Sequence, residues 1–235
     1  MNNRISFKIW GRYGLFTDPL TKIGGEKCSY HLPTYEALKG VVKSIYWKPT
    51  LIWIIDRVRV LKQIRTHTKG MKPLVFGGAK SNSLAYYTYL ADVAYEVEAH
   101  FIWNPHRPEL AHDRIDGKHH QIAQRYLNRG GRQDIFLGTR DCQAYVEPCK
   151  FGANRSAYQD LNELGFGLMF HGFDYPDETG TNEFYARFFC PVMKQGIVQF
   201  LPPEECEIRR FIRNMTAKEF KQNQNFIGLE ESGLV

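Results

Sequence analysis

The 235-residue sequence has few cysteines and no long apolar run. Its five cysteines are odd in number and form no CxxC pair. This argues against a disulfide framework or a zinc knuckle and favours a reducing, cytoplasmic setting. The longest apolar run covers residues 51–55, far below the roughly 20 residues that a membrane helix needs. The sequence therefore predicts no membrane partner.

The motifs of metal and nucleotide enzymes are also missing. The sequence contains no HExxH, no P-loop and no dinucleotide fingerprint, and the spacing of His106 and His112 does not suit a metal pair. We therefore expect a protein without a metal ion or another cofactor. The 43% hydrophobic and 14% aromatic content is nevertheless enough for a folded core, which argues against global disorder.

Acidic residues are scarce in the first two thirds of the chain. Residues 1–150 carry a net charge of +10, whereas residues 151–235 carry −4. A basic front predicts a polyanionic partner such as RNA or duplex DNA, although an asymmetry of this size also occurs as ordinary surface variation. The same charge distribution disfavours an enzyme that acts on small molecules.

The strongest chemical signal lies in residues 117–140, GKHHQIAQRYLNRGGRQDIFLGTR. Lys118 and His119 fall where a helix is expected to begin, and the Gly-Gly pair at 130–131 suits its left-handed C-terminal cap. The stretch has one acid, Asp134, against the basic residues Lys118, Arg125, Arg129, Arg132 and Arg140. A helix start, basic side chains and flexible backbone are the ingredients of a phosphate-handling site.

RNA can be cut without a metal when a base removes the proton of a 2′-hydroxyl and an acid protonates the leaving 5′-oxygen. His119 can serve as either group near neutral pH, and Lys118 can stabilise charge on the phosphoryl oxygens. A Lys-His-His run at a helix start is also typical of a solvated helix end. The Gly-rich loop and its arginines, which follow at once, favour the catalytic interpretation.

The hydrophobic periods predict the order strand, helix, strand, strand, helix, strand over residues 1–149. The expected strands cover 5–16, 50–66, 87–103 and 134–147, and the expected helices run from Thr34 to about Tyr46 and onward from Gly117. This order is typical of ferredoxin-like, RRM-like βαββαβ domains. We therefore predict an α+β fold whose N-terminal ferredoxin-like domain carries a Gly-rich loop. The third strand is too long to run flat, so we expect a break or a bulge near Leu90.

Residues 150–235 show a different pattern. Short strands are expected over 166–170, 184–193 and 197–201, with turns at 175–180 and 194–196. We predict a small C-terminal antiparallel β-sheet domain over 150–235, with a loose polar tail from about Met215 onward. In the first half, the long loop over 17–33 is expected to bring Lys22 and Lys27 to a nucleic acid.

Five blocks of the sequence are long enough to compare as motifs: GKHHQIAQR, GGRQDIFLGTRDCQAYV, ALKGVVKSIYWKPT, LFTDPLTKIGGEK and HGFDYPDETG. They resemble the CRISPR-associated proteins of the fifth Cas family, d subtype, the pre-crRNA endoribonucleases of type I-C systems within the RAMP superfamily. The resemblance implies metal-independent cleavage at the 3′ base of the CRISPR repeat hairpin, which leaves a 2′,3′-cyclic phosphate. It also implies that the protein keeps the crRNA within the interference complex, beside a large subunit and a repeated backbone subunit.

Carried over onto this sequence, the family's catalytic Tyr falls on Tyr46 in SIYWKPT, and its Lys and His fall on Lys118 and His119 in GKHH. The resemblance implies that Lys118 stabilises the pentavalent phosphorane, while His119 and Tyr46 share the acid, base and orienting roles. The sequence leaves open which of these two is the base and which the acid. It also leaves open a contribution from His120.

Two other functions stay open on the sequence. The chain could hold the 5′ handle of a guide RNA without cutting it, as related subunits of other CRISPR complexes do, or it could bind duplex DNA through its basic half. The joint presence of Tyr46, Lys118 and His119 argues against a non-catalytic subunit. The candidate RNA-binding residues, which would hold phosphates without reading sequence, are Lys22, Lys27, Arg125, Arg129, Arg132 and Arg140.

Overall fold

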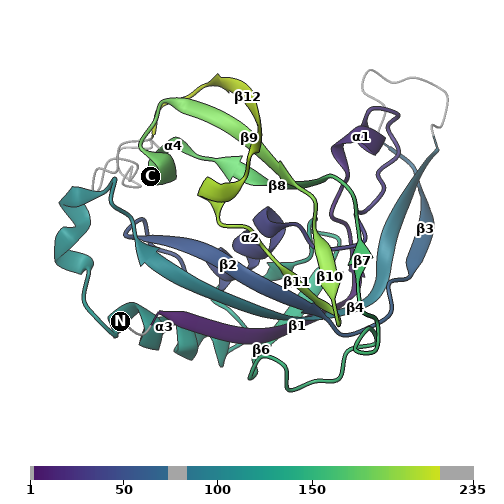
Figure 1. Cartoon of the computed structure of the whole chain (residues 1–235), viewed down its shortest axis with the longest axis horizontal. Coiled ribbons are helices and arrows are strands. Elements are labelled where there is room, and N and C mark those ends of the chain that lie inside the picture. The colour runs from purple at the N-terminus through teal and green to yellow at the C-terminus, as the bar shows by residue number, and fades with distance from the viewer. Residues whose placement is uncertain (1–2, 74–83, 218–235) are drawn as a thin grey trace, which may run out of the picture.

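The computed structural model describes residues 3–73 and 84–217 and shows a mixed α/β fold, mostly of antiparallel sheet with few helices (Figure 1). A nine-stranded sheet has the order β5-β6-β1-β4-β2-β11-β10-β7, with β3 paired to β4. A three-stranded sheet has the order β12-β9-β8. No helix within the described ranges is long and apolar enough to cross a membrane.

The elements have the following bounds. The larger sheet consists of β1 (Arg4–Gly14), β2 (Leu51–Val60), β3 (Thr66–Met71), β4 (Ala85–Trp103), β5 (Ile135–Phe136), β6 (Gln143–Pro148), β7 (Leu164–Gly165), β10 (Val192–Lys194) and β11 (Ile197–Gln199). The smaller sheet consists of β8 (Met169–Asp174), β9 (Glu183–Phe189) and β12 (Ile208–Asn214). The described helices are α1 (Pro19–Lys22), α2 (Tyr35–Ile45), α3 (Lys118–Leu127), α4 (Pro176–Thr179) and the 3-10 helices η1 (Pro108–Asp113) and η2 (Pro203–Glu205).

Four central strands and two helices form the frame of the first half. Along the chain β1, α2, β2, β4, α3 and β6 follow one another, and in space the strands lie in the order β6-β1-β4-β2. Helix α2 packs against β2, and α3 packs against β1 and β6. Phe7 of β1 and Val97 of β4 are fully buried in one core with Leu38 of α2 and Leu127 of α3. The core therefore lies between the sheet and these two helices.

Helix α2 begins and ends where the sequence predicts. Thr34 is its N-cap, and the Thr34 hydroxyl accepts a hydrogen bond from the Ala37 backbone N–H at 3.2 Å. Leu38, Val42 and Ile45 form its buried stripe. The chain becomes extended at Tyr46, whose φ is −158°, so the helix delivers the Tyr46 side chain at its C-terminal end.

Helix α3 lies between glycines that adopt left-handed backbone angles. Gly117 is its N-cap with φ 74°, and Gly130 and Gly131 follow its end with φ 84° and 112°. The Gly131 N–H donates to the Tyr126 carbonyl at 2.9 Å, and a Cβ at Gly131 would lie 3.0 Å from the Gln133 carbonyl oxygen. The predicted helix and its glycine cap are both confirmed.

Two predicted strands are wrong in extent. The strand expected over 50–66 ends at Val60, and β3 is a separate strand that pairs with the first part of β4. The strand expected over 134–147 is a hairpin of β5 and β6, because Gly138, with φ 91°, turns the chain against the Leu15 backbone. Strand β4 is continuous, and the irregularity expected near Leu90 lies at Asp92, which has φ 52° and stands where the partner of β4 changes from β3 to β2.

Residues 150–217 contribute to both sheets. Strands β11, β10 and β7 extend the larger sheet outward from β2, whereas β8, β9 and β12 make up the smaller one. Strand β12 was not expected, because its arginines and exposed apolar side chains hide any period-two pattern. The division into domains 1–149 and 150–235 stays a prediction. The expected loose tail lies, from residue 218 onward, outside the described residues.

Candidate active site

Helix α3 aims its first two side chains in different directions. His119, Ala123 and Leu127 are spaced four residues apart and form the buried stripe of the helix. His119 is 0% exposed, whereas the Lys118 side chain is 40% exposed. The start of α3 therefore places an imidazole inside the protein and an ammonium group beside it at the surface.

Tyr46 reaches the same imidazole from the end of α2. The Tyr46 hydroxyl lies 2.8 Å from His119 Nδ1, and the Tyr46 ring stacks on Tyr126 with 6.1 Å between ring centroids. The Trp53 indole N–H donates to the Tyr46 carbonyl at 2.8 Å and holds the backbone in place. Tyr46 is 2% exposed, so the phenol and the imidazole form a buried pair.

Asp113, at the end of η1, completes the arrangement. Its carboxylate accepts hydrogen bonds from Lys118 Nζ at 2.6 Å and from the Thr50 hydroxyl at 2.9 Å. Its backbone carbonyl lies 2.7 Å from His119 Nε2. We call these residues the helix cluster: Tyr46, Thr50, Asp113, Lys118 and His119. The structure thus brings the three predicted catalytic residues together around an aspartate that the sequence analysis did not find.

The hydrogen bonds fix the neutral tautomer of His119. A carbonyl oxygen can only accept, so Nε2 carries the hydrogen that is donated to the Asp113 carbonyl. In the neutral ring Nδ1 is then an acceptor, and the Tyr46 hydroxyl donates to it. A proton can therefore pass from the phenol to the imidazole without either ring moving.

The surroundings set the charge of two members of the helix cluster. Burial, together with the nearby Asp113 and Tyr126, raises the pKa of Tyr46 to about 12 in spite of the opposing charge of Arg132. Burial alone would raise the pKa of Asp113, but hydrogen bonds from Lys118 and Thr50 and the nearby His119 outweigh it and lower that pKa. At neutral pH the site therefore holds a neutral phenol and an ionised carboxylate.

The Gly-rich loop joins the site through its backbone. The Arg132 and Gln133 N–H groups both donate to the Ser44 carbonyl at 3.1 Å, in the last turn of α2 next to Tyr46. Arg132 is exposed, and its charge acts on the Tyr46 phenol. Arg125 and Arg129 are exposed on and just after α3. The loop thus extends the helix cluster into a basic surface.

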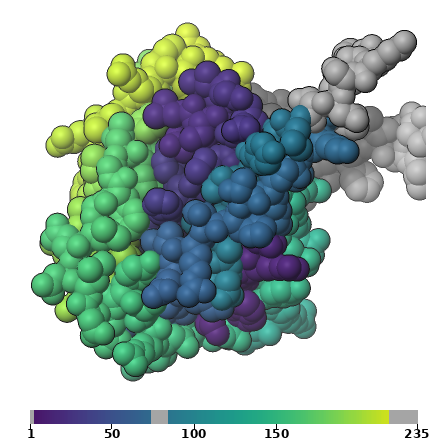
Figure 2. All heavy atoms as spheres, turned by 90° about the vertical axis from the view of Figure 1, so that its right-hand side faces the viewer, coloured from purple at the N-terminus to yellow at the C-terminus, as the bar shows by residue number. Residues whose placement is uncertain are grey.

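The remaining RNA-binding candidates lie elsewhere. Helix α1, which ends at Lys22, and the β3–β4 hairpin lie side by side at the end of the molecule opposite α3 (Figures 1 and 2). Lys27 is half-buried there, with its ammonium 5.0 Å from the Tyr87 ring, and its carbonyl accepts from the Thr88 N–H. Arg140 is exposed in the turn between β5 and β6, beside Asp141. The structure does not bring Lys22 or Lys27 to the helix cluster.

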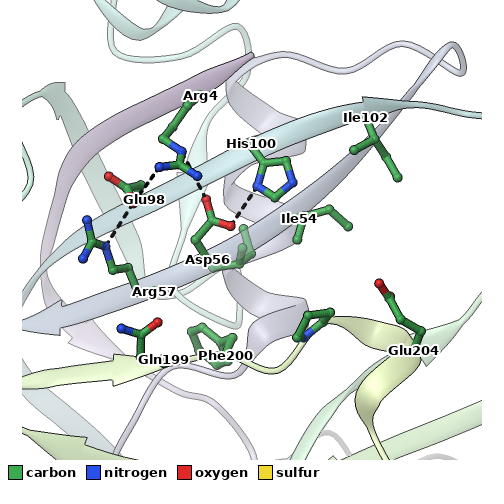
Figure 3. A pocket seen from close by; sticks show the side chains of 12 residues that line it. Arg4, Ile54, Asp56, Arg57, Glu98, His100, Ile102, Gln199, Phe200 and Glu204 are labelled. Carbon is green, nitrogen blue, oxygen red and sulfur yellow. Dashed lines mark hydrogen bonds and ion pairs between the residues drawn. The ribbon is translucent and has the colours of Figure 1, made fainter. Parts of the chain in front are cut away.

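A second group of charged residues lines a cavity of about 620 Å³ (Figure 3). We call it the sheet cluster: Arg4, Asp56, Arg57, Glu98 and His100. His100 Nδ1 lies 2.8 Å from an Asp56 carboxylate oxygen, and Arg57 Nε lies 3.0 Å from one of Glu98. None of the nine predicted site residues, all of which the structure describes, lines this cavity.

His120 connects the two clusters rather than joining the helix cluster. Its Nε2–H donates to the backbone carbonyl of Arg4 at 3.0 Å, and the Arg4 side chain lies over the cavity of the sheet cluster. This contact gives His120 a role in fixing the start of β1 against α3.

Sequence reasoning missed Thr50 and Asp113. Both lie in connections without a hydrophobic period, and their importance depends on contacts with residues far away in the chain. The one available signal was the presence of Asp113 five residues before Lys118, ahead of a helix start.

Comparisons with known proteins identify the family of the chain. The family model Cas_Cas5d, described as a CRISPR-associated protein (Cas_Cas5), matches residues 5–201, a range that includes the whole helix cluster. The chain therefore belongs to the Cas5d family of CRISPR-associated proteins.

Two curated relatives share a name. The CRISPR pre-crRNA endoribonuclease Cas5d of Mannheimia succiniciproducens is 29% identical over 247 residues, which cover 89% of this chain and all of the relative. The protein of the same name from Thermus thermophilus is 31% identical over 154 residues, or 62% of this chain and 64% of the relative. A crystal structure described as a CRISPR-associated protein is 34% identical with a TM-score of 0.73, and the match covers 88% of this chain and 96% of that one.

Proposed function

We propose that this chain is a metal-independent endoribonuclease that cleaves pre-crRNA at the 3′ base of the CRISPR repeat hairpin. The observation that carries the proposal is the convergence of Tyr46, Lys118 and His119 within one cluster, in a family whose curated members are named pre-crRNA endoribonucleases. Attack by the 2′-hydroxyl on the adjacent phosphorus would leave a 2′,3′-cyclic phosphate.

The hydrogen-bond directions suggest how the proton moves. As the Tyr46 oxygen takes the proton of the 2′-hydroxyl, the phenol passes its own proton to His119 Nδ1. The 2′-oxygen then bonds to phosphorus, the bond to the 5′-oxygen breaks, and that oxygen takes a proton from water. In this scheme His119 is the final base and Tyr46 is the relay. Lys118 stabilises the charge on the phosphoryl oxygens as a point charge.

The arginines around the helix cluster would hold the RNA backbone. Arg125, Arg129 and Arg132 are exposed on and after α3, where the chain continues into the Gly-rich loop. Phosphate contacts position a nucleic acid without reading its sequence. Lys22, Lys27 and Arg140 would then contact a more distant part of the RNA, near the β3–β4 hairpin.

The finer assignments belong to the same proposal. The strand order β6-β1-β4-β2, with α2 and α3 on one face, supports a ferredoxin-like N-terminal domain over residues 1–149. We assign residues 150–235 to a C-terminal β-sheet domain, and we place the protein in the cytoplasm. There it would stay with the mature crRNA, beside the large and repeated backbone subunits of the type I-C interference complex.

The test uses the repeat RNA of the CRISPR array that accompanies the gene, in excess EDTA. One RNA is all-ribose, and a second carries a single 2′-deoxy sugar just upstream of the scissile phosphate. We expect cleavage of the first, none of the second, and a cyclic phosphate on the upstream product. Cleavage of the deoxy RNA, or cleavage that requires a divalent ion, would contradict the proposal.

One observation favours an alternative. His119 and Tyr46 are almost fully buried, so the structure as described offers RNA only the ammonium group of Lys118. For a subunit that holds the 5′ handle of crRNA without cutting it, this exposed cation would be sufficient. Tight binding of the all-ribose RNA without cleavage would establish this function instead, and preference for duplex DNA over the repeat RNA would make the chain a DNA-binding protein.

A further inference from the structure

Two hydrogen bonds end on the Asp113 carboxylate, and a third donor lies close to it. Lys118 Nζ is 2.6 Å from one oxygen, and the Thr50 hydroxyl is 2.9 Å from the other. His119 Nε2 lies 3.5 Å from the second oxygen and 2.7 Å from the carbonyl of the same residue. An ammonium and a hydroxyl from distant places in the chain thus bind one anion, and the ring N–H of the residue next to Lys118 lies close by.

A phosphodiester binds the same kinds of hydrogen-bond donor as this carboxylate. Both are singly charged groups whose oxygens only accept hydrogen bonds, and both are bound best by charged donors. Lys118 is already paired with Asp113, which neutralises part of its charge. The attraction of Lys118 for a phosphate is therefore weaker while that ion pair lasts. The carboxylate therefore lies where the proposed reaction requires the phosphoryl oxygens to be.

We propose that Lys118, Thr50 and His119 form the binding site for the scissile phosphodiester, and that Asp113 fills this site until RNA displaces it. The inference rests on the proposed function and deepens it. It assigns Thr50 as a phosphate ligand and Asp113 as an internal competitor of the RNA.

The segment that carries Asp113, residues 105–116, has few contacts that would hold it in place. The 3-10 helix η1 has no buried residue. The segment is anchored at one end, where Asn104 is buried and its amide donates to the Asp177 carbonyl at 2.8 Å. At the other end it continues into α3. Few buried contacts between two fixed ends are typical of segments that open locally.

Displacement of Asp113 would release two catalytic groups in one step. Its carboxylate binds Lys118, and its carbonyl binds His119 Nε2. When the segment moves outward, Lys118 becomes free for the phosphate, and His119 Nε2 loses its carbonyl partner. Binding of the substrate would thus free both the ammonium group and one ring nitrogen of the fully buried histidine.

The first experiment compares Asp113→Asn with Asp116→Asn by binding of fluorescent repeat RNA that carries the uncleavable 2′-deoxy sugar. Asp116 is a matched control, because it is an exposed acid in the same connection and its carboxylate accepts a hydrogen bond from the neighbouring Gly117 N–H. We expect Asp113→Asn to bind about tenfold tighter, within the usual range of coupling between competing ligands, and Asp116→Asn to change affinity less than about twofold. In a Lys118→Ala background the gain from Asp113→Asn should vanish.

Binding by Asp113→Asn that is unchanged or weaker would make Asp113 a positioning residue and overturn the inference. Equal tightening in both variants would show a general charge effect and overturn it too. The proposed function is tested separately, because the wild-type protein would still cleave the all-ribose RNA if only this inference failed.

A second measurement needs no variant. Amide hydrogen exchange of the wild-type protein is compared with and without the uncleavable RNA. We expect faster exchange over residues 105–116 in the complex, because the segment leaves its contacts with Lys118 and Thr50. Slower or unchanged exchange there, with protection elsewhere confirming that RNA is bound, would contradict displacement.

Discussion

The helix cluster and the sheet cluster both place a histidine beside an aspartate and basic side chains. In the sheet cluster the partners come from neighbouring strands, with His100 and Asp56 on β4 and β2 and an Arg57–Glu98 pair between the same strands. In the helix cluster the acid comes from η1, a surface segment without buried side chains. The same residue types are therefore held by paired strands in the sheet cluster, whereas in the helix cluster the aspartate is carried by a surface segment.

This difference separates a structural network from a candidate site. The backbones of neighbouring strands are held together by the sheet, so the charged side chains of the sheet cluster stay within reach of one another. Asp113 can leave Lys118 while α2, α3 and the strands keep their positions. Only the helix cluster also has a phenol–imidazole pair and adjoins the arginines of the Gly-rich loop. A chemical site needs a group whose partner can be exchanged for substrate.

The largest difference between the clusters should appear on removal of their cations. We expect Lys118→Ala to slow single-turnover cleavage of the repeat RNA by about 10³-fold, because it removes the charge that stabilises the phosphorane. Arg57→Ala, the matched change in the sheet cluster, should leave the rate within about twofold of wild type. Equal losses in the two variants would remove the distinction between the clusters.

Tyr46→Phe should have the next largest effect. The substitution keeps the ring and its stacking on Tyr126 but removes the hydroxyl that donates to His119. We expect cleavage to fall by about 10²-fold, the usual size of one proton-transfer contribution, with RNA affinity nearly unchanged. A variant that cuts at the wild-type rate would show that the phenol takes no part in the reaction.

Asp56→Asn should affect stability rather than cleavage. It weakens the bond to His100 and the ion pair with Arg4, so we expect a loss of about 1–3 kcal/mol in the free energy of unfolding, measured with urea. Because the sheet cluster does not contact substrate in this account, the cleavage rate at a temperature where the variant is folded should not change. A tenfold slower reaction with full folding would assign this cluster a direct role.

The smallest expected effect is that of alkaline pH on the rate. With a Tyr46 pKa of about 12, only about one phenol in ten thousand is ionised at pH 8. A mechanism that used the phenolate as base would therefore speed up tenfold per pH unit as the pH rises toward that pKa. A neutral relay predicts a rate that changes less than about threefold between pH 7.5 and 9. A tenfold rise per unit in single-turnover assays would make Tyr46 the base itself.

Local signals in the sequence were enough for much of the fold. The Thr34 cap and the spacing of Leu38, Val42 and Ile45 determine α2, and the glycines around α3 mark both of its ends. The period-two pattern of β4 was equally clear. The pattern did not show where strands change partners, because that depends on tertiary pairing. This is why β3 was missed, whereas β12 was missed because it has no clear period-two pattern.

Part of the candidate site could also be predicted from local sequence signals. Tyr46, Lys118 and His119 stand at helix ends, where sequence marks position well, and the structure brings them together. Asp113 and Thr50 stand in connections, and only the folded chain shows that they meet Lys118. The burial of His119 follows from its place in the stripe with Ala123 and Leu127, which the motif alone does not reveal.

The role of His119 as the proton acceptor is tested by single-turnover cleavage with His119→Gln and His100→Gln, on the same repeat RNA in excess EDTA and at equal bound fraction. Both histidines lie beside an aspartate, and glutamine keeps a hydrogen-bonding side chain without proton transfer near neutral pH. We predict a loss of about 10²- to 10⁴-fold for His119→Gln and less than about twofold for His100→Gln. Full activity in a folded His119→Gln protein would contradict the account and move the reaction away from the start of α3.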